Sequence, residues 1–145
     1  MAEKKSTTVV WRDDMIFTGY NSGYTVPLDA VKTHGGHDAG ISPMGLMLTS
    51  LAGCTAMDVI SILRKKRQNV TGLEVQVEGI RADEHPRVYT DINVHFVVTG
   101  HDVDPAAVER AIELSRDKYC GAAATLRHTA QMTYTHEVIE DESDA

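Results

Sequence analysis

The chain has 145 residues, 42% of them hydrophobic, and a formal net charge of −7 at pH 7. We expect residues 1–145 to form a single domain, because this length supplies a core that is stable without disulfides. The acidic balance argues against a nucleic-acid partner, since binding to phosphates requires a basic face. The polar ends, residues 1–6 and 140–145, are expected to be frayed.

The N-terminus has no apolar run, so we expect no signal peptide and a cytoplasmic protein. Between Asp38 and Asp58 the chain is uncharged. Pro43 delays the start of a helix there, which leaves too few helical residues before Asp58 to cross a bilayer, and no membrane partner is expected.

The basic cluster Arg64–Arg67 ("RKKR") is interpreted as the end of a helix, where cations complement the helix dipole; the alternative is an anion or nucleotide site.

The first 28 residues predict three short strands. Aromatic and β-branched residues gather at Val9–Trp11, Ile16–Phe17 and Tyr24–Val26, and turn-forming residues separate these groups. This spacing is typical of a β-meander.

A glycine-rich loop, "KTHGGHDAGISPMG", leads into the central helix. Ser42 is suited to the N-cap position and Pro43 to the first helical position. From Met44 to about Arg67 the sequence is apolar nearly all round, so this helix must be covered on most of its sides. A chain of this size has few other elements for that purpose, which indicates that a second subunit helps.

The remaining sequence predicts a hairpin, a helix and a strand. Residues 73–83 and 87–100 alternate apolar and polar side chains with period two, as in an antiparallel hairpin with one buried face. Asp104 and Pro105 open an amphipathic helix that we expect to continue to Cys120, and residues 125–139 are expected to form the last strand. This order predicts an α+β fold with antiparallel sheets rather than a doubly wound parallel sheet.

Cys54 and Cys120 are the two cysteines of the chain. Cys54 lies about three turns into the central helix, too far from its N-terminus for the helix dipole to activate the thiol. Taken alone, a cysteine in the middle of a helix is most simply a buried core residue. Both cysteines, however, are bordered by small residues ("LAGCTA" and "CGAAA"), and two thiols with cleared space suit a thiol peroxidase.

The segments "SPMGLMLTSLAGCTAMDVISILRKKRQ" and "KYCGAAATLRH" resemble the OsmC/Ohr family, the osmotically inducible protein C and organic hydroperoxide resistance proteins, and its OsmC-like branch above all. The resemblance covers nearly the whole domain. It implies antiparallel sheets wrapped around a long buried central helix in an intertwined homodimer. It also implies thiol-dependent reduction of organic hydroperoxides without a cofactor, with Cys54 as the peroxidatic thiol, Cys120 as the resolving thiol and an external dithiol as reductant.

In that family an arginine from the N-terminal strands and a glutamate near the start of the central helix hold the attacking thiolate. Arg12 is the only arginine in the N-terminal region and is therefore the candidate. The position of the glutamate is occupied here by Met44 and Gly45. Asp38 is an alternative carboxylate, but nothing in the sequence places it at the thiol.

Several other residues have a structural interpretation beside a functional one. Met44, Met47 and Met57 at helical spacing indicate core packing first, and an adaptable apolar pocket for a lipid-like peroxide second; they are our candidate substrate-binding residues. His34, His37 and Asp38 in "HGGHD" are metal-binding residue types, but glycine-rich spacing fixes none of them, so we expect no metal and a flexible loop at the rim of a pocket.

Two further functions stay open beside peroxide reduction. The first is a redox sensor on the same fold, which forms a disulfide without peroxide turnover. The second is a non-catalytic dimer that binds a small apolar ligand, with Cys54 merely buried.

Overall fold

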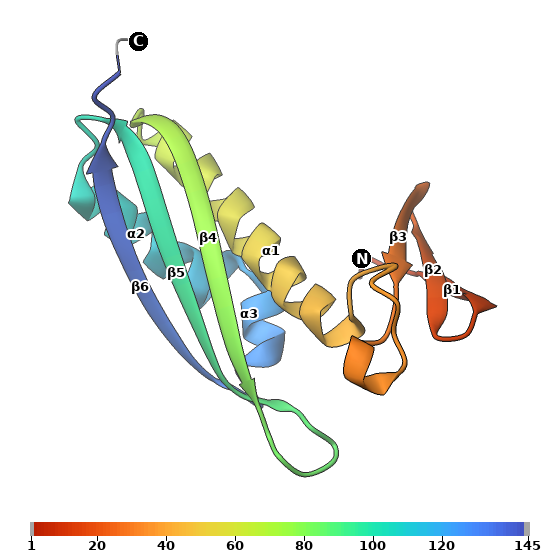
Figure 1. Ribbon diagram of the computed structural model, residues 1–145. Helices are drawn as coiled ribbons and strands as arrows, with labels where there is room; N and C mark the ends of the chain where they lie inside the picture. The colour runs from red at the N-terminus through yellow and green to blue at the C-terminus, as the bar shows by residue number, and fades with distance from the viewer. Residues whose placement is uncertain (1, 144–145) are drawn as a thin grey trace. The chain divides into compact units, whose positions relative to one another are not determined.

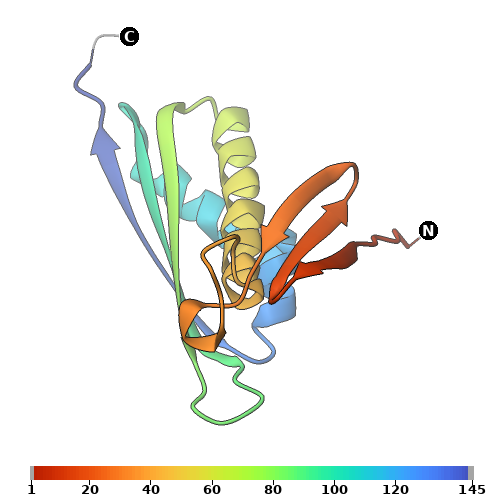
Figure 2. The same ribbon diagram turned by 45° about the vertical axis from the view of Figure 1, so that its right-hand side comes forward.

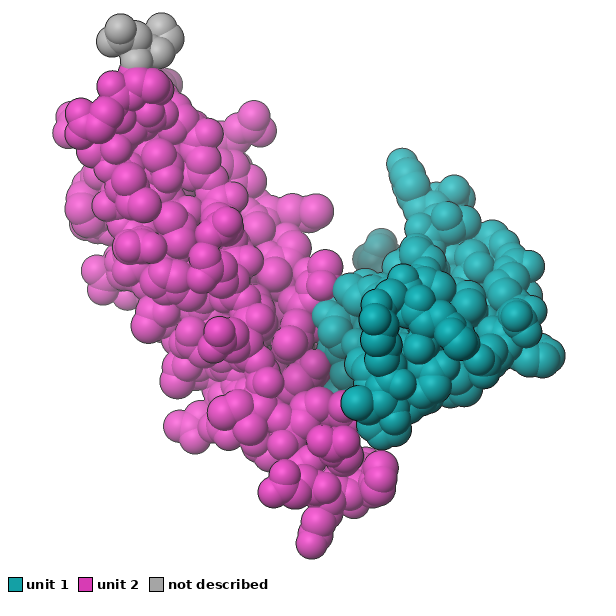
Figure 3. All heavy atoms as spheres, in the orientation of Figure 1, with its two compact units in different colours: residues 1–47 teal, residues 48–145 magenta. Residues whose placement is uncertain are grey.

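The structure is a computed structural model and describes residues 2–143. By its internal contacts the chain divides into two compact units, residues 1–47 and 48–145 (Figure 3). A 3₁₀ turn (η1) and a π-helical turn (η2) accompany the helices and strands labelled in Figure 1. In chain order the elements are β1 (Thr8–Asp13), β2 (Ile16–Asn21), β3 (Tyr24–Leu28), η1 (Lys32–His34), α1 (Pro43–Lys65), β4 (Asn69–Arg81), β5 (Tyr89–His101), α2 (Pro105–Leu114), η2 (Ser115–Tyr119), α3 (Gly121–Leu126) and β6 (Gln131–Glu140).

The first unit contains the predicted meander. Its three strands are antiparallel in the order β1-β2-β3, and the Ser22–Gly23 turn between β2 and β3 has φ of 52° and 83°, as the favoured two-residue hairpin turns require. The glycine-rich loop that follows is held by Asp29, which is 2% exposed. Its carboxylate accepts hydrogen bonds from the backbone N–H groups of Ala30, His37 and Ala39, so a buried anion fixes the path of this loop.

Helix α1 starts where the sequence predicts. Ser42 Oγ accepts a hydrogen bond from the Gly45 N–H at 3.1 Å, and Pro43 is the first helical residue. By length and composition alone α1 could cross a membrane, a property that core helices of soluble proteins share. Its buried side chains are spaced four residues apart and form one stripe: Leu51, Thr55, Val59 and Leu63. Met57 is 72% exposed, so a single chain covers one face of the helix and leaves another open.

The second unit is a sheet in the order β4-β5-β6 with helices on one face (Figures 1 and 2). The predicted hairpin is confirmed, because β4 and β5 pair antiparallel. Alternate residues of β5 are buried and form the core with α2: Ile92, Val94, Phe96 and Val98 from the strand, and Val108, Ala111 and Ile112 from the helix. Asp104 caps α2 by accepting a hydrogen bond from the Ala106 N–H at 3.0 Å.

The α+β class is confirmed, but three details of the C-terminal region differ from the prediction. Strand β6 pairs parallel to β5, which the α2–η2–α3 crossover permits. Residues 121–126 form a short helix, so Thr125 and Leu126 do not belong to the last strand, which starts at Gln131 and not at Thr125; alanine favours helix and Cys120 Sγ accepts a hydrogen bond from the Ala123 N–H. The second helix accordingly ends at Leu114 and does not run on to Cys120 as an α-helix.

The N-terminal and C-terminal segments of the chain differ in how far regular structure extends toward each end. Residues 2–6 lie outside the regular elements, whereas Glu140 still belongs to β6 and the Asp141 carboxylate accepts a hydrogen bond from Thr71 Oγ1 at 2.6 Å. The expectation of fraying at Met1 and at residues 144–145 falls outside the described residues.

Candidate active site

The structure brings the two thiols together. The sulfur atoms of Cys54 and Cys120 and a carboxylate oxygen of Asp58 all lie within 4.8 Å of one another. Both thiols are free. Because an S–S bond is about 2.05 Å long, the two sulfur atoms need to approach by less than about 3 Å to form a disulfide.

Helix geometry explains how α1 contributes two of these groups. Cys54 and Asp58 are four residues apart, which places both side chains on the same face of the helix. The neighbouring buried residue Thr55 lies on the edge of that face and is 2% exposed. One turn of α1 therefore carries a thiol, a hydroxyl and a carboxylate toward the opposite segment.

The opposite segment is the π-helical turn η2. The Cys120 N–H donates to the Ser115 carbonyl oxygen at 2.8 Å, a bond that spans five residues. In an α-helix, residues five apart point in directions about 140° apart, but the wider π turn stacks them on one face. Ser115 and Cys120 thus both face α1, which an α-helix of the same sequence would not achieve.

Ser115 also fixes the carboxylate of Asp58. Its Oγ donates to Asp58 Oδ2 at 2.9 Å and lies 2.8 Å from Thr55 Oγ1. Because a hydroxyl has one proton and an ionised carboxylate only accepts, Thr55 is the donor to Ser115. This buried chain of hydrogen bonds holds Asp58 beside the thiols. Sequence analysis did not select Asp58, although its spacing from Cys54 was a usable signal.

The two thiols have different environments. Cys120 is 3% exposed, and burial raises its pKa to about 11; its hydrogen bond with Cys54 and the negative charge of Asp58 act in the same direction. The Ala123 N–H, 3.4 Å from the sulfur, opposes this shift. Cys54 is partly exposed. A reagent from solvent therefore reaches Cys54 more easily than Cys120.

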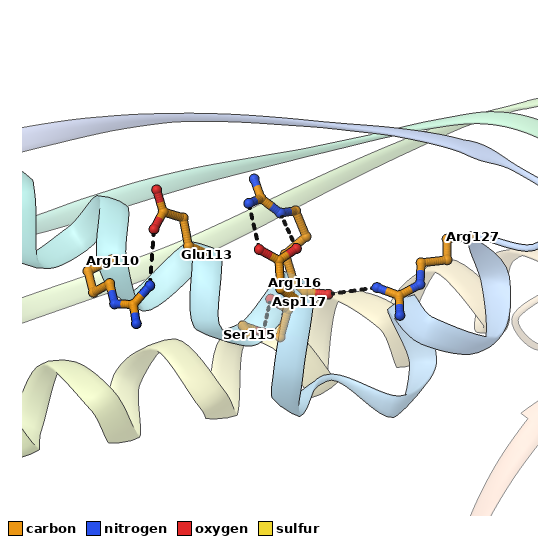
Figure 4. Close-up of polar contacts among 7 residues, drawn as sticks. Arg110, Glu113, Ser115, Arg116, Asp117 and Arg127 are labelled. Atoms are coloured by element: carbon orange, nitrogen blue, oxygen red, sulfur yellow. Dashed lines mark hydrogen bonds and ion pairs between the residues drawn. The ribbon is translucent and has the colours of Figure 1, made fainter.

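The basic side chains near Ser115 have partners of their own. In Figure 4, Ser115 points toward α1, while Arg116 extends on the side of the sheet. Arg116 forms two hydrogen bonds with Asp117, at 2.7 and 2.8 Å, and Arg127 donates to the Arg116 carbonyl oxygen at 3.2 Å. Burial raises the pKa of Tyr134, whose ring centroid is 5.8 Å from the Arg116 guanidinium carbon. The charge of Arg116 is thus balanced by Asp117.

Comparison with known proteins matches residues 35–135 to the family of OsmC-like proteins. The chain belongs to this family. Protein YhfA of Escherichia coli (strain K12) is 41% identical over 132 residues, which are 90% of this chain and 96% of that relative. A hypothetical protein from Aquifex aeolicus VF5 has a similar structure, with 28% identity, a TM-score of 0.87 and coverage of 97% of this chain and 100% of that chain. An organic hydroperoxide resistance protein, OsmC, from Legionella pneumophila shares the fold at 9% identity, with a TM-score of 0.70 and coverage of 95% and 99%.

In this OsmC-like chain the predicted thiolate-binding arginine belongs to the first unit. Arg12 lies on β1, where its Nε donates to Thr18 Oγ1 at 3.1 Å and its Nη2 donates to the Tyr20 hydroxyl. The guanidinium is also stacked on the Tyr20 ring, 5.8 Å from its centroid. These contacts fix the side chain on the meander. Its role at the thiol stays a prediction.

The "HGGHD" residues have separate partners. His37 Nε2 lies 2.5 Å from Asp14 Oδ2, and this hydrogen bond raises the pKa of His37. Asp38 forms an ion pair with Lys32 at 2.7 Å. His34 Nδ1 lies 3.3 Å from Thr33 Oγ1, so the three side chains have different partners. The group of described residues whose donor atoms converge on one point is instead Cys54, Asp58 and Cys120.

The first unit also contains an apolar cavity of about 400 Å³, lined by Val9, Met15, Phe17, Leu28, Asp29, Ala30 and Pro43. Met15, which lines this cavity, is not among the methionines that the sequence predicts to bind substrate. Of the methionines that were selected, Met47 is 41% exposed, Met57 is 72% exposed and Met44 is half-buried. Their part in substrate binding stays a prediction.

Proposed function

We propose that this OsmC-like protein reduces organic hydroperoxides with the thiols of Cys54 and Cys120. The observation that carries the proposal is the convergence of the two sulfur atoms, from segments 66 positions apart in the sequence, within 4.8 Å. Family membership supports a redox function, and the same fold is found in an organic hydroperoxide resistance protein from Legionella pneumophila.

Cys54 is the thiol that we propose attacks the peroxide, because it is the more exposed of the two. Its thiolate attacks one oxygen of the O–O bond, which gives a sulfenic acid and, after uptake of a proton, an alcohol. The helix surface next to Cys54 is open: apart from the chain neighbours and the backbone of the same helix, a Cβ added at Gly53 would meet no atom of the described residues within 4 Å. This opening supports access by a substrate with an organic group.

Cys120 is assigned the resolving step. Its sulfur attacks the sulfenic sulfur of Cys54, which forms the disulfide and releases water. A buried thiol with a raised pKa is a weak nucleophile toward solvent reagents, but the adjacent sulfenic acid is within reach of a small movement. An external dithiol then reduces the disulfide by thiol–disulfide exchange, and no cofactor is required.

Arg12, Met44, Met47 and Met57 are the residues proposed to assist. Arg12 would supply the positive charge that holds the Cys54 thiolate, without the family's glutamate. The flexible, polarisable side chains of the three methionines suit the apolar body of a hydroperoxide. Substitution of Arg12 or of one of these methionines, followed by the stopped-flow kinetics described below for the cysteines, tests these roles.

A homodimer is part of the proposal. The open face of α1, with Met57 72% exposed, is apolar and continuous with the buried stripe of the same helix. Contact with the α1 helix of a second copy would cover it. We place the reaction in the cytoplasm, where a dithiol reductant is available to recycle the disulfide.

Stopped-flow kinetics with cumene hydroperoxide and dithiothreitol test the proposal. The wild-type protein is expected to turn over, and Cys54→Ser is expected to abolish both turnover and the first reduction of peroxide. Cys120→Ser is the matched control, because it should keep the first reduction and accumulate a sulfenic acid that dimedone traps. Consumption of hydroperoxide by Cys54→Ser at the wild-type rate would contradict the proposal.

The apolar cavity of the first unit favours a second candidate, non-catalytic binding of a small apolar ligand. Saturable binding of an apolar fluorescent probe that Phe17→Ala weakens, in a protein whose thiols do not react with hydroperoxides, would support this alternative.

A further inference from the structure

The carboxylate of Asp58 is not used by the thiol chemistry described above. It nevertheless lies within 4.8 Å of both sulfur atoms and is oriented by the Ser115 hydroxyl, which Thr55 orients in turn. Ser115 is fully buried and Thr55 is 2% exposed. A fixed carboxylate beside two thiols is an arrangement that can bind a positively charged ligand.

The spacing of the three groups suits a single metal ion. Zinc binds thiolate sulfur at about 2.3 Å and carboxylate oxygen at about 2.0–2.2 Å, so two donors of one tetrahedral ion lie about 3.5–3.8 Å apart. The three donor atoms here are within 4.8 Å of one another. Closure by about 1 Å, within reach of side-chain rotation, would bring them into coordination distance.

The chemistry of the donors selects the class of metal. Two thiolates favour borderline or soft cations such as Zn²⁺ and Cd²⁺ over Mg²⁺ or Ca²⁺. Once ionised, the two thiolates and the carboxylate concentrate negative charge, which a divalent cation neutralises. Ser115 donates to Asp58 Oδ2 and so orients this carboxylate, in the manner of the hydrogen-bonding partners that orient metal ligands.

We propose that the reduced protein binds one soft divalent metal ion through Cys54, Cys120 and Asp58. Three protein ligands leave the fourth tetrahedral position for water or for an exogenous ligand, and the partial exposure of Cys54 gives the ion a way in. Two of the ligands are four residues apart on α1, and the third, Cys120, directly follows the π turn η2 and caps α3.

Binding of the metal and oxidation of the thiols exclude each other. Loading Zn²⁺ onto the two thiols releases two protons. Oxidation of the loaded site by one hydroperoxide takes up two protons and yields the disulfide, one alcohol, one water and free Zn²⁺. The metal would thus be held by the reduced form and released by the oxidised form.

Anaerobic titration of the reduced protein with Cd²⁺ tests this site, because Cd²⁺ bound to thiolates has a charge-transfer absorbance in the ultraviolet. Competition with a chromophoric chelator gives the affinity for Zn²⁺. We expect one ion per chain, loss of the high-affinity site in Cys54→Ser and Cys120→Ser, and a weakening by at least about tenfold in Asp58→Asn. Asp83→Asn, in the exposed β4–β5 loop, is the matched control and should bind like the wild type.

Binding by the wild type no tighter than by Cys54→Ser would overturn the proposal. So would equal affinities of Asp58→Asn and the wild type, since the ion would then be held by the dithiol without the carboxylate. The wild-type protein oxidised to its disulfide provides a control without any substitution and should not bind. None of these measurements uses peroxide turnover, so the metal site and the peroxidase proposal can fail separately.

Discussion

The reactivity of Cys120 gives the sharpest quantitative prediction. Cys54→Ser leaves Cys120 as the only thiol and keeps the burial that is the main cause of its raised pKa. A thiol with a pKa of about 11 instead of 9.0 is ionised about 100-fold less at pH 8, and reactivity follows the thiolate. Since Cys120 is also 3% exposed, we expect alkylation at least about 100-fold slower than in the unfolded chain.

Iodoacetamide labelling followed by mass spectrometry measures this rate between pH 7 and 10. The same variant unfolded in urea is the reference, and Cys120→Ser, which retains Cys54, is the matched control that should react faster. The rate for Cys120 should rise about tenfold per pH unit over this range. A rate within about threefold of the unfolded reference at pH 8, or a plateau below pH 9, would refute the reasoning.

Three further predictions concern stability. Ser115→Ala leaves the Asp58 carboxylate without its buried donor and should lower the free energy of unfolding in urea by about 1–3 kcal/mol; no measurable loss would contradict the hydrogen-bond chain. Phe96→Ala should cost about 3–5 kcal/mol, and Val97→Ala, on the opposite face of β5, clearly less. Three backbone N–H groups, that of His37 foremost, lower the pKa of Asp29, so its contribution is present above its ordinary pKa of 3.8 and is lost as the pH falls through the lowered value. In unfolding experiments between pH 2 and 6, Asp29→Asn should reduce the loss of stability that the wild-type protein shows as the pH falls. An unchanged pH dependence would contradict this role of Asp29.

Local patterns predicted most of the regular elements. The period-two alternation of residues 73–83 and 87–100 predicts most of β4 and β5, because the face to which each side chain points alternates along a strand whatever the rest of the fold is. It misses the first four residues of β4, which begins at Asn69. Ser42 with Pro43 marks the start of α1 for the same reason, through one local cap. The parallel pairing of β6 could not be read in this way, because it depends on how the crossover returns the chain to the sheet.

The candidate site was predictable in part. The small residues around each cysteine and the family resemblance indicated that Cys54 and Cys120 act as a pair, and the structure places their sulfur atoms close together. The contribution of Ser115 depends on the π turn, whose extra residue leaves no periodic signal in the sequence. The spacing of Asp58 from Cys54, one helical turn, is the local signal for this carboxylate, but its position beside Cys120 depends on how the opposite segment packs against α1.

The reaction of the reduced wild-type protein with one equivalent of cumene hydroperoxide tests the central claim most directly. Mass spectrometry of peptides, digested after the remaining thiols are alkylated, identifies the bond that forms. The account predicts a Cys54–Cys120 disulfide within one chain, with the mass lower by two hydrogen atoms. Two unmodified thiols after the hydroperoxide has been consumed, or a disulfide confined to Cys54 residues of different chains, would contradict it.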